Sequence, residues 1–184
     1  QLMALTVVRP IDHFSGLHTF FPDLSSGQGA APFKTVEDYE NNLKRVDGSV
    51  VAIDRSIGRF RQGMASGVVQ PKLVVNNVIG QLDTLIGQGV EGSTFYLPIK
   101  NMPAEIAAAD KVRLAAAYRQ SIGTEIIPAF TRLRDFLKNE YLPVARDSLG
   151  LAGMKGGNSL YAHLIEDNTT LPLTADYVHD LGLS

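Results

Sequence analysis

The apolar positions between residues 36 and 64 recur at alternating steps of three and four. This alternation places them on one face of an α-helix, as a heptad-like stripe. Thr35 is a candidate N-cap before the run, and Gly63 and Gly67 are candidate stop signals after it. We therefore expect one long helix whose apolar stripe consists of Val36, Tyr39, Leu43, Val46, Val50, Ile53, Ile57, Phe60 and Met64.

A second helix is expected to begin at Gln70-Pro71. Proline suits the first turn of a helix, where its missing N–H leaves no hydrogen bond unmade. The apolar spacing then continues through Val75, Val78, Leu82 and Leu85. Because the connection to the first helix is short, the two helices should pack antiparallel as a hairpin.

The next part of the chain predicts a loop at 87–103 and then a third helix. Pro103 is its expected first residue and Gly150 its expected stop. Pro128 and Pro143 lie inside it and should kink it, because each removes a backbone hydrogen bond and crowds the preceding turn. Its apolar face consists of Ile126, Phe130, Leu133 and Leu137.

Two short helices are expected at the C-terminal end. One runs from about Ser159 to Glu166, and the other is capped by Thr174 and stopped by Gly182. The chain shows neither the period-two alternation of strands nor an internal repeat. The predicted fold is all-α, with a helical hairpin of long antiparallel helices, a kinked third helix and short C-terminal helices. Residues 35–184 are expected to form one helical domain.

Residues 1–34 have a different character. They are rich in glycine, proline, serine and aromatic residues and lack periodicity, which predicts an irregular N-terminal arm. A polar linker would not carry so many aromatic side chains, so we expect phenylalanines to attach this arm to the helical body. These are Phe14, Phe20, Phe21 and Phe33.

Composition limits the classes of function. The length of 184 residues fits one domain, and 45% hydrophobic with 20% charged residues is ordinary for a globular protein. A formal charge of -2 gives no electrostatic reason to expect nucleic acid or an anionic membrane as partner. No apolar run approaches the roughly 20 residues that span a bilayer, so no transmembrane segment is expected.

Cysteine is absent, which excludes disulfides, thiolate zinc sites and cysteine nucleophiles. The chain begins at Gln1, so we expect a processed or trimmed form from which any signal peptide has gone. An exported or periplasmic location and a cytoplasmic one both fit this composition, with a slight preference for export.

The four histidines do not form a metal or catalytic motif. A zinc peptidase helix would show His-Glu-x-x-His, and none of His13, His18, His163 and His179 has that spacing. Asp176 with His179, and His163 with Asp167, are expected to be local pairs on helix surfaces. No serine lies in a Gly-x-Ser-x-Gly turn. We therefore predict no catalytic residue and no metal ligand in this chain.

One cluster of candidate binding residues remains, at Gly156, Gly157, Asn158, Tyr161 and His163. The two glycines are compatible with a tight turn that needs positive φ. They are also compatible with exposed backbone N–H groups at the start of a helix, where a carboxylate would be attracted. The residues alone leave both interpretations open.

The same segment carries a family resemblance. MKGGNSLYAHLIEDNTTLPLTADYVHDLGL, residues 154–183, resembles Pro-Gly-Gly-x-x-Tyr-Tyr-x-x-Leu-x-x-x-x-Thr-Thr followed by Leu-Thr-Pro-Glu-Glu-x-His-x-Leu-Gly. That pattern is found in the bacterial proteins catalogued as domain of unknown function 885. Further segments resemble the same family in the same order: PIDHFSGLHTFFPDL, TVEDYENNLKRV, RFRQGMASGVVQPKLVVNNVIGQLDTLI and FTRLRDFLKNEYLPVAR.

The chain departs from this pattern at a few positions. Met154-Lys155 stands where the family has proline near the glycines, and Leu160 replaces the first tyrosine of the pair. Ala175 stands where proline follows the threonine. These changes affect details of the loop and leave the order of the motifs intact.

The resemblance implies a helical, gluzincin-like zinc metallopeptidase. Its members are much longer and carry a His-Glu-x-x-x-x-His-His-like segment downstream, which is absent here. By this resemblance the chain is an inactive fragment, and zinc belongs to the full-length protein. Gly156, Gly157, Asn158, Tyr161 and His163 would face a peptide-binding cleft. The implied partners are the remainder of the polypeptide and a peptide substrate, and a homodimer could form through exposed apolar helix surface.

Two other functions are kept as alternatives. The first is a stand-alone helical interaction or scaffold module, which would use the stripe from Tyr39 to Met64 to bind a partner helix. The second is a sensor with a small-molecule pocket between its helices, which no feature of the sequence specifically favours.

Overall fold

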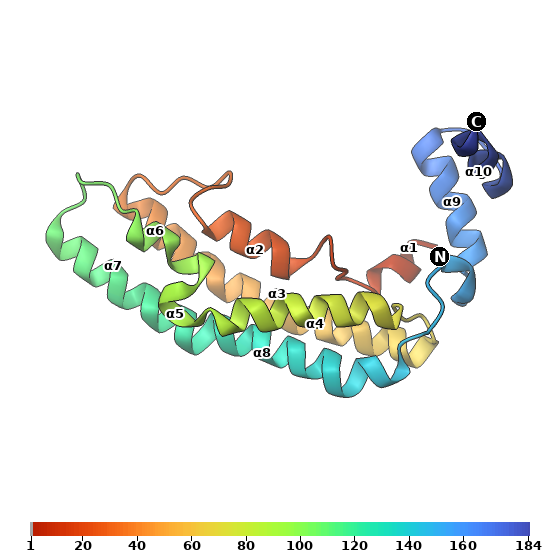
Figure 1. The fold of residues 1–184 in the computed structure, drawn as a ribbon. Helices are drawn as coiled ribbons and strands as arrows, with labels where there is room; N and C mark the ends of the chain where they lie inside the picture. Colours follow the sequence, from red (N-terminus) through yellow and green to blue (C-terminus); the bar gives the residue numbers. More distant parts are fainter. Residues whose placement is uncertain (1) are drawn as a thin grey trace.

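Three long helical stretches run side by side along the molecule (Figure 1). The computed structural model describes residues 2–184, and within that range it contains no β-strand, which confirms the all-α prediction. None of the described helices is both long and apolar enough to cross a membrane. The first two stretches are α3 (Val36–Ser66) and α4 (Lys72–Gly87), and the third runs through α7 (Ala108–Ser121), η2 (Ile122–Ile126), α8 (Ile127–Phe136), η3 (Leu137–Tyr141) and η4 (Leu142–Val144).

Helix α3 begins and ends where the sequence predicts. The hydroxyl of Thr35 accepts a hydrogen bond from the Asp38 N–H at 3.3 Å, and the Asp38 carboxylate accepts one from the Thr35 N–H at 2.9 Å. This capping box satisfies two backbone donors that the first turn would leave unpaired. Gly67 ends the helix in the left-handed region, at φ 75°. Every residue of the predicted apolar stripe lies in the core or packs against it.

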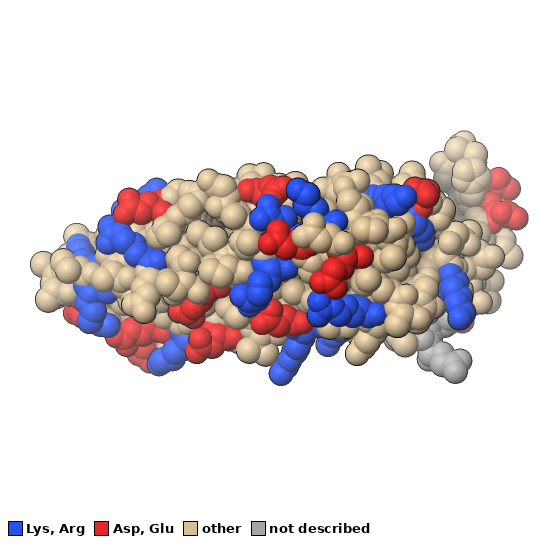
Figure 2. Space-filling model, turned by 90° about the horizontal axis from the view of Figure 1, so that it is seen from below, with Lys and Arg blue, Asp and Glu red and all other residues tan. Residues whose placement is uncertain are grey.

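Ion pairs show how the long helices are oriented. Three pairs join α3 to the third stretch with residue numbers rising together: Glu40–Arg113, Asp54–Arg132 and Arg61–Glu140. Two further pairs join α4 and the turn after it to the third stretch: Asp83–Arg134 and Glu91–Arg119. In these pairs the residue number in the third stretch falls as the other number rises. The third stretch is therefore parallel to α3 and antiparallel to α4. Basic and acidic side chains are accordingly interspersed over the underside of the bundle (Figure 2).

The central element of the core is α8. Helices α3 and α4 are connected as the predicted hairpin, yet each packs chiefly along α8 rather than along the other. Phe130 and Leu133 of α8 are fully buried, as are Phe60 of α3 and Leu82 of α4. Sequence periodicity identified the apolar face of each helix, but it could not show that both α3 and α4 pack on α8.

The two prolines of the third stretch coincide with changes of helix type. The π-helical turn η2 ends two residues before Pro128, and the π-helical turn η3 ends two residues before Pro143. A proline lacks the N–H for a bond to the carbonyl one turn earlier, and its ring crowds that carbonyl. A widened turn relieves this crowding. The structure therefore has a π-helical turn just before each proline at which the sequence predicted a kink. The stretch then ends at Val144, so the prediction that Gly150 stops it was wrong.

The segment predicted as a loop at 87–103 is partly helical. It contains the short elements α5 (Gly89–Gly92), η1 (Thr94–Tyr96) and α6 (Leu97–Lys100). Phe95 and Tyr96 are buried in the core, and this packing stabilises turns that local sequence does not specify. The following helix, α7, begins at Ala108 rather than at Pro103, because Pro103 and Ile106 first close a tight turn.

The prediction of an irregular N-terminal arm was wrong in part. It contains α1 (Leu2–Val7) and α2 (Leu17–Ser25). Helix α2 lies along α3, where His18 and Phe21 become buried, and this burial offsets the weak helix signal of the sequence. Two of the four phenylalanines attach the arm, since Phe21 is buried and Phe33 is partly buried. Phe14 and Phe20 remain exposed.

The two predicted C-terminal helices are present as α9 (Gly157–Thr169) and α10 (Ala175–Leu183). The hydroxyl of Thr174 accepts a hydrogen bond from the Tyr177 N–H at 3.2 Å, as a cap should. Helix α9 projects from one end of the bundle and packs on α1 (Figure 1). A second small core of Val68, Met154 and Leu160 holds this junction together.

Candidate functional site

The two adjacent glycines form the turn that starts α9. Gly156 is exposed and has φ +74°, a conformation that side chains other than glycine rarely adopt. Gly157 is buried, and a Cβ added there would lie 1.7 Å from the carbonyl oxygen of Leu151. This geometry supports the interpretation of the pair as a tight turn. Gly157 faces the protein's own backbone, so it cannot also receive a ligand on that side.

Helix α9 brings together only part of the predicted cluster. Asn158 and Tyr161 are three residues apart, which places them on one helical face, and both are exposed. The Tyr161 side chain is 46% exposed. His163 is two residues beyond Tyr161, so it points to a different face. Within residues 2–184, no ion pair joins His163 to Asp167 or Asp176 to His179, so the expected local pairs do not form.

No assembled metal centre was found in the described part of the chain. Among residues 2–184, no group of three or more histidine, aspartate or glutamate side chains is placed to hold a metal ion. His18, the most buried histidine, binds Gln81 Oε1 through Nε2 at 3.0 Å. Burial lowers the pKa of His18, which favours its neutral form. The Nε2 atom of His18 is therefore engaged by another side chain of the same bundle.

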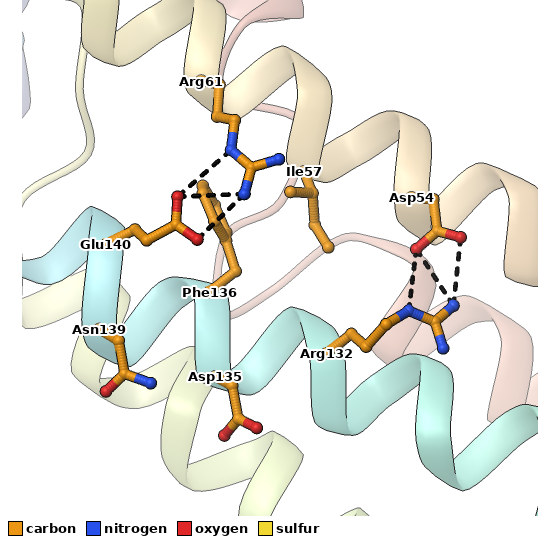
Figure 3. Close-up of a pocket in the computed structure, with 8 residues that line it drawn as sticks. All are labelled: Asp54, Ile57, Arg61, Arg132, Asp135, Phe136, Asn139 and Glu140. Carbon is orange, nitrogen blue, oxygen red and sulfur yellow. Dashed lines mark hydrogen bonds and ion pairs between the residues drawn. The ribbon is translucent and has the colours of Figure 1, made fainter.

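A groove of about 520 Å³ lies between α3 and α8 (Figure 3). Arg61 binds both carboxylate oxygens of Glu140, at 3.0 and 3.1 Å, and its guanidinium lies 5.1 Å from the centre of the Phe136 ring. Arg132 binds both oxygens of Asp54, each at 3.1 Å. Since these charges are paired with one another across the groove, they connect α3 to the third helical stretch.

Breaking one of these groove pairs should have little effect on stability. We expect Arg132→Gln to lower the free energy of unfolding by less than about 1 kcal/mol, because both partners are half exposed and exposed ion pairs contribute little. Urea denaturation would measure it, with the exposed Arg55→Gln as matched control. A loss several times larger than the control's would show that the pair fixes the position of α8 on α3.

Tyrosine hydroxyls bind buried polar groups at two places in the core. Tyr141 accepts a hydrogen bond from the Gln70 N–H at 2.8 Å, and Tyr118 accepts one from the Asn42 amide at 3.2 Å. Burial raises the pKa of Tyr141 to about 12, so the hydroxyl stays protonated. Sequence reasoning did not single out these residues. The signal for Tyr141 was its place in the Glu-Tyr-Leu-Pro-x-Ala-Arg run that carries the family resemblance.

The architecture defines an all-α protein built on three long helices, with a projecting C-terminal helical pair that begins at a double-glycine turn. The family model described as "Bacterial protein of unknown function (DUF885)" matches residues 2–184. The chain belongs to this family. A search of curated proteins finds no match, and a search of solved structures finds none either.

Proposed function

We propose that this chain is the non-catalytic helical portion of a zinc metallopeptidase-like protein and contributes one wall of a peptide-binding cleft. The class of protein comes from the resemblance of its ordered motifs to longer, peptidase-like family members. Membership of the family supports that resemblance without stating an activity. The zinc would be held by the remainder of the polypeptide.

The observation that carries the proposal is the exposed pair of Asn158 and Tyr161 on α9. Neither side chain has a hydrogen-bond partner within the described residues. The amide of Asn158 can donate and accept, and so can the hydroxyl of Tyr161. Together they offer donors and acceptors for the N–H and C=O groups of an extended peptide. The Gly156–Gly157 turn fixes where the helix begins, and so holds this pair in place.

The exposed apolar surface of α10 supports the proposal that this end of the chain packs against the remainder of the polypeptide. No residue of α10 is buried, and Tyr177, Leu181 and Leu183 are 55%, 61% and 75% exposed. Apolar side chains gathered at the end of a molecule are typical of a surface that contacts another chain or segment. The remainder of the polypeptide is the proposed occupant. The alternative is that a second copy of this chain binds there, and sedimentation at two concentrations would detect such a dimer.

The surface that the scaffold alternative requires is largely buried in the structure. That alternative required the stripe from Tyr39 to Met64 to be free for a partner helix. Tyr39, Ile53 and Phe60 of that stripe are instead at most 1% exposed, because they pack on the chain's own helices. A partner helix could reach the stripe only if the bundle opened.

Replacing Tyr161 with phenylalanine should weaken peptide binding. We expect a loss of about threefold to tenfold in affinity, the effect of removing one hydrogen bond to a neutral group. Fluorescence anisotropy with a labelled pool of short unstructured peptides would measure it. Tyr177→Phe is the matched control, because Tyr177 is the other exposed tyrosine of α9 and α10. Equal affinities for both variants and the parent protein would contradict the assignment of Tyr161 to the cleft.

A further inference from the structure

A second cavity, of about 350 Å³, lies where α1, the start of α4 and the segment after Val144 meet. Its volume is at the lower end of the range of about 300–1,000 Å³ typical of small-molecule sites. Its polar lining includes Arg9, Arg146 and Asp12, and its apolar lining includes Phe14, Val74 and Leu151. None of these residues belongs to the proposed peptide-binding wall on α9.

Backbone carbonyls hold both arginines of this cavity. Arg9 Nε donates to the Leu5 carbonyl at 3.0 Å. Arg146 Nε donates to the Val69 carbonyl at 3.1 Å, and its Nη1 donates to the carbonyls of Ser148 and Gly150. These bonds fix the two guanidinium planes without neutralising their charge.

The outer nitrogen atoms of the two arginines have no partner within residues 2–184. Both Nη atoms of Arg9 and the Nη2 atom of Arg146 make no described hydrogen bond, and neither arginine forms an ion pair there. The arginines on the long helices differ, because they bind carboxylates: Arg61, Arg113, Arg119, Arg132 and Arg134.

The electrostatic environment of the two arginines favours an anion beside them. Burial lowers the pKa of Arg9, and the nearby positive charge of Arg146 lowers it further. Burial also lowers the pKa of Arg146. Tyr141 does not compensate, because it stays protonated. The negative charge of Asp12 raises the pKa of Arg9, but the Asp12 carboxylate already accepts hydrogen bonds from the N–H groups of Phe14 and Ser15.

We propose that Arg9 and Arg146 bind the carboxylate of a small ligand whose apolar body lies against Phe14, Val74 and Leu151. The free donors on the two guanidinium groups match the two oxygen atoms of a carboxylate, which arginine binds in a bidentate manner. A phosphate dianion would place a second negative charge beside apolar walls and the carboxylate of Asp12, so this cavity suits it less well. The carboxylate could be the C-terminal end of a peptide or a free branched-chain acid.

Titration calorimetry with four probes tests the site on the intact chain. We expect acetyl-leucine or 4-methylpentanoate to bind, and acetyl-leucinamide and inorganic phosphate to bind at least about tenfold more weakly, since they lack a carboxylate. Tighter binding of acetyl-leucine than of 4-methylpentanoate indicates a peptide end, and the reverse order indicates a free acid. Either order supports the site.

Variants assign this binding to the two arginines. Arg9→Gln should weaken binding of the acid by roughly tenfold or more, because a charged hydrogen-bond donor is lost. The exposed Arg45→Gln is the control and should leave it unchanged. If circular dichroism shows Arg9→Gln to be unfolded, Arg146→Lys takes its place, since it keeps the charge and loses the bidentate geometry. The proposal is overturned if neither acid binds, if the amide or phosphate binds as tightly as the acid, or if the folded variant binds like the control.

Discussion

Gly157→Ala is expected to lower the free energy of unfolding of the α9 region by about 3 kcal/mol or more. The added methyl group would overlap the Leu151 carbonyl oxygen, 1.7 Å away, and backbone atoms cannot swing aside as a flexible side chain can. The start of α9 would have to move, which would open the small core around Met154 and Leu160. Chemical denaturation would measure the loss, and hydrogen exchange of the α9 amides would localise it.

Gly150→Ala is the matched control for this experiment. Gly150 has φ -66° and no atom within 4 Å of an added Cβ, so the change should stay within about 0.5 kcal/mol. If the two alanine variants were equally stable, the glycine at position 157 would not be required by the turn. The same result would reopen its interpretation as a place of close ligand approach.

Leu133→Ala should strongly destabilise the core of the bundle. Leu133 is 0% exposed and lies on α8, the helix on which both α3 and α4 pack. Removing a buried leucine side chain loses its transfer free energy and leaves a cavity, at a total cost of about 2–5 kcal/mol. Urea denaturation of the purified variant would give this value from the shift of the midpoint at constant slope.

Leu73→Ala is the comparison for this variant, because Leu73 is 55% exposed on the outer face of α4. It should lower stability by less than about 0.5 kcal/mol. Similar losses for both variants would mean that α8 does not form the centre of the core. The description of α8 as the helix on which both α3 and α4 pack would then be wrong.

Local signals predicted the parts of the fold that local interactions determine. The long helix α3 follows from its apolar stripe, from the Thr35–Asp38 cap and from the stop at Gly67, all of which lie in one stretch of sequence. Helix α10 follows in the same way from the Thr174 cap. In both cases the residues that begin the helix are within one turn of it.

The elements that the sequence did not predict are stabilised by distant contacts. Helix α2 and the turn η1 form where Phe21 and Phe95 meet, with ring centres 5.0 Å apart, although these residues are far apart in the chain. Periodicity in a single segment carries no information on such a contact. The π-turns likewise depend on how a proline fits into a helix that packing keeps continuous.

The candidate sites also divide into features that local sequence predicts and features that depend on distant contacts. The sequence located the Gly156–Gly157 turn, because adjacent glycines mark turns. It grouped Tyr161 with His163, which the helix then separates onto different faces. It did not pair Arg9 with Arg146, because these residues are far apart in the sequence and approach each other only in the folded protein.

The proposed peptide-binding wall can be tested by following backbone amide shifts while an unlabelled pool of short unstructured peptides is added. The largest shifts are predicted at Asn158 and Tyr161, on the exposed face of α9, and they should be absent from the groove between α3 and α8. Shifts confined to that groove or to α10, or no saturable shift at all, would contradict the assignment of α9 to a peptide-binding cleft.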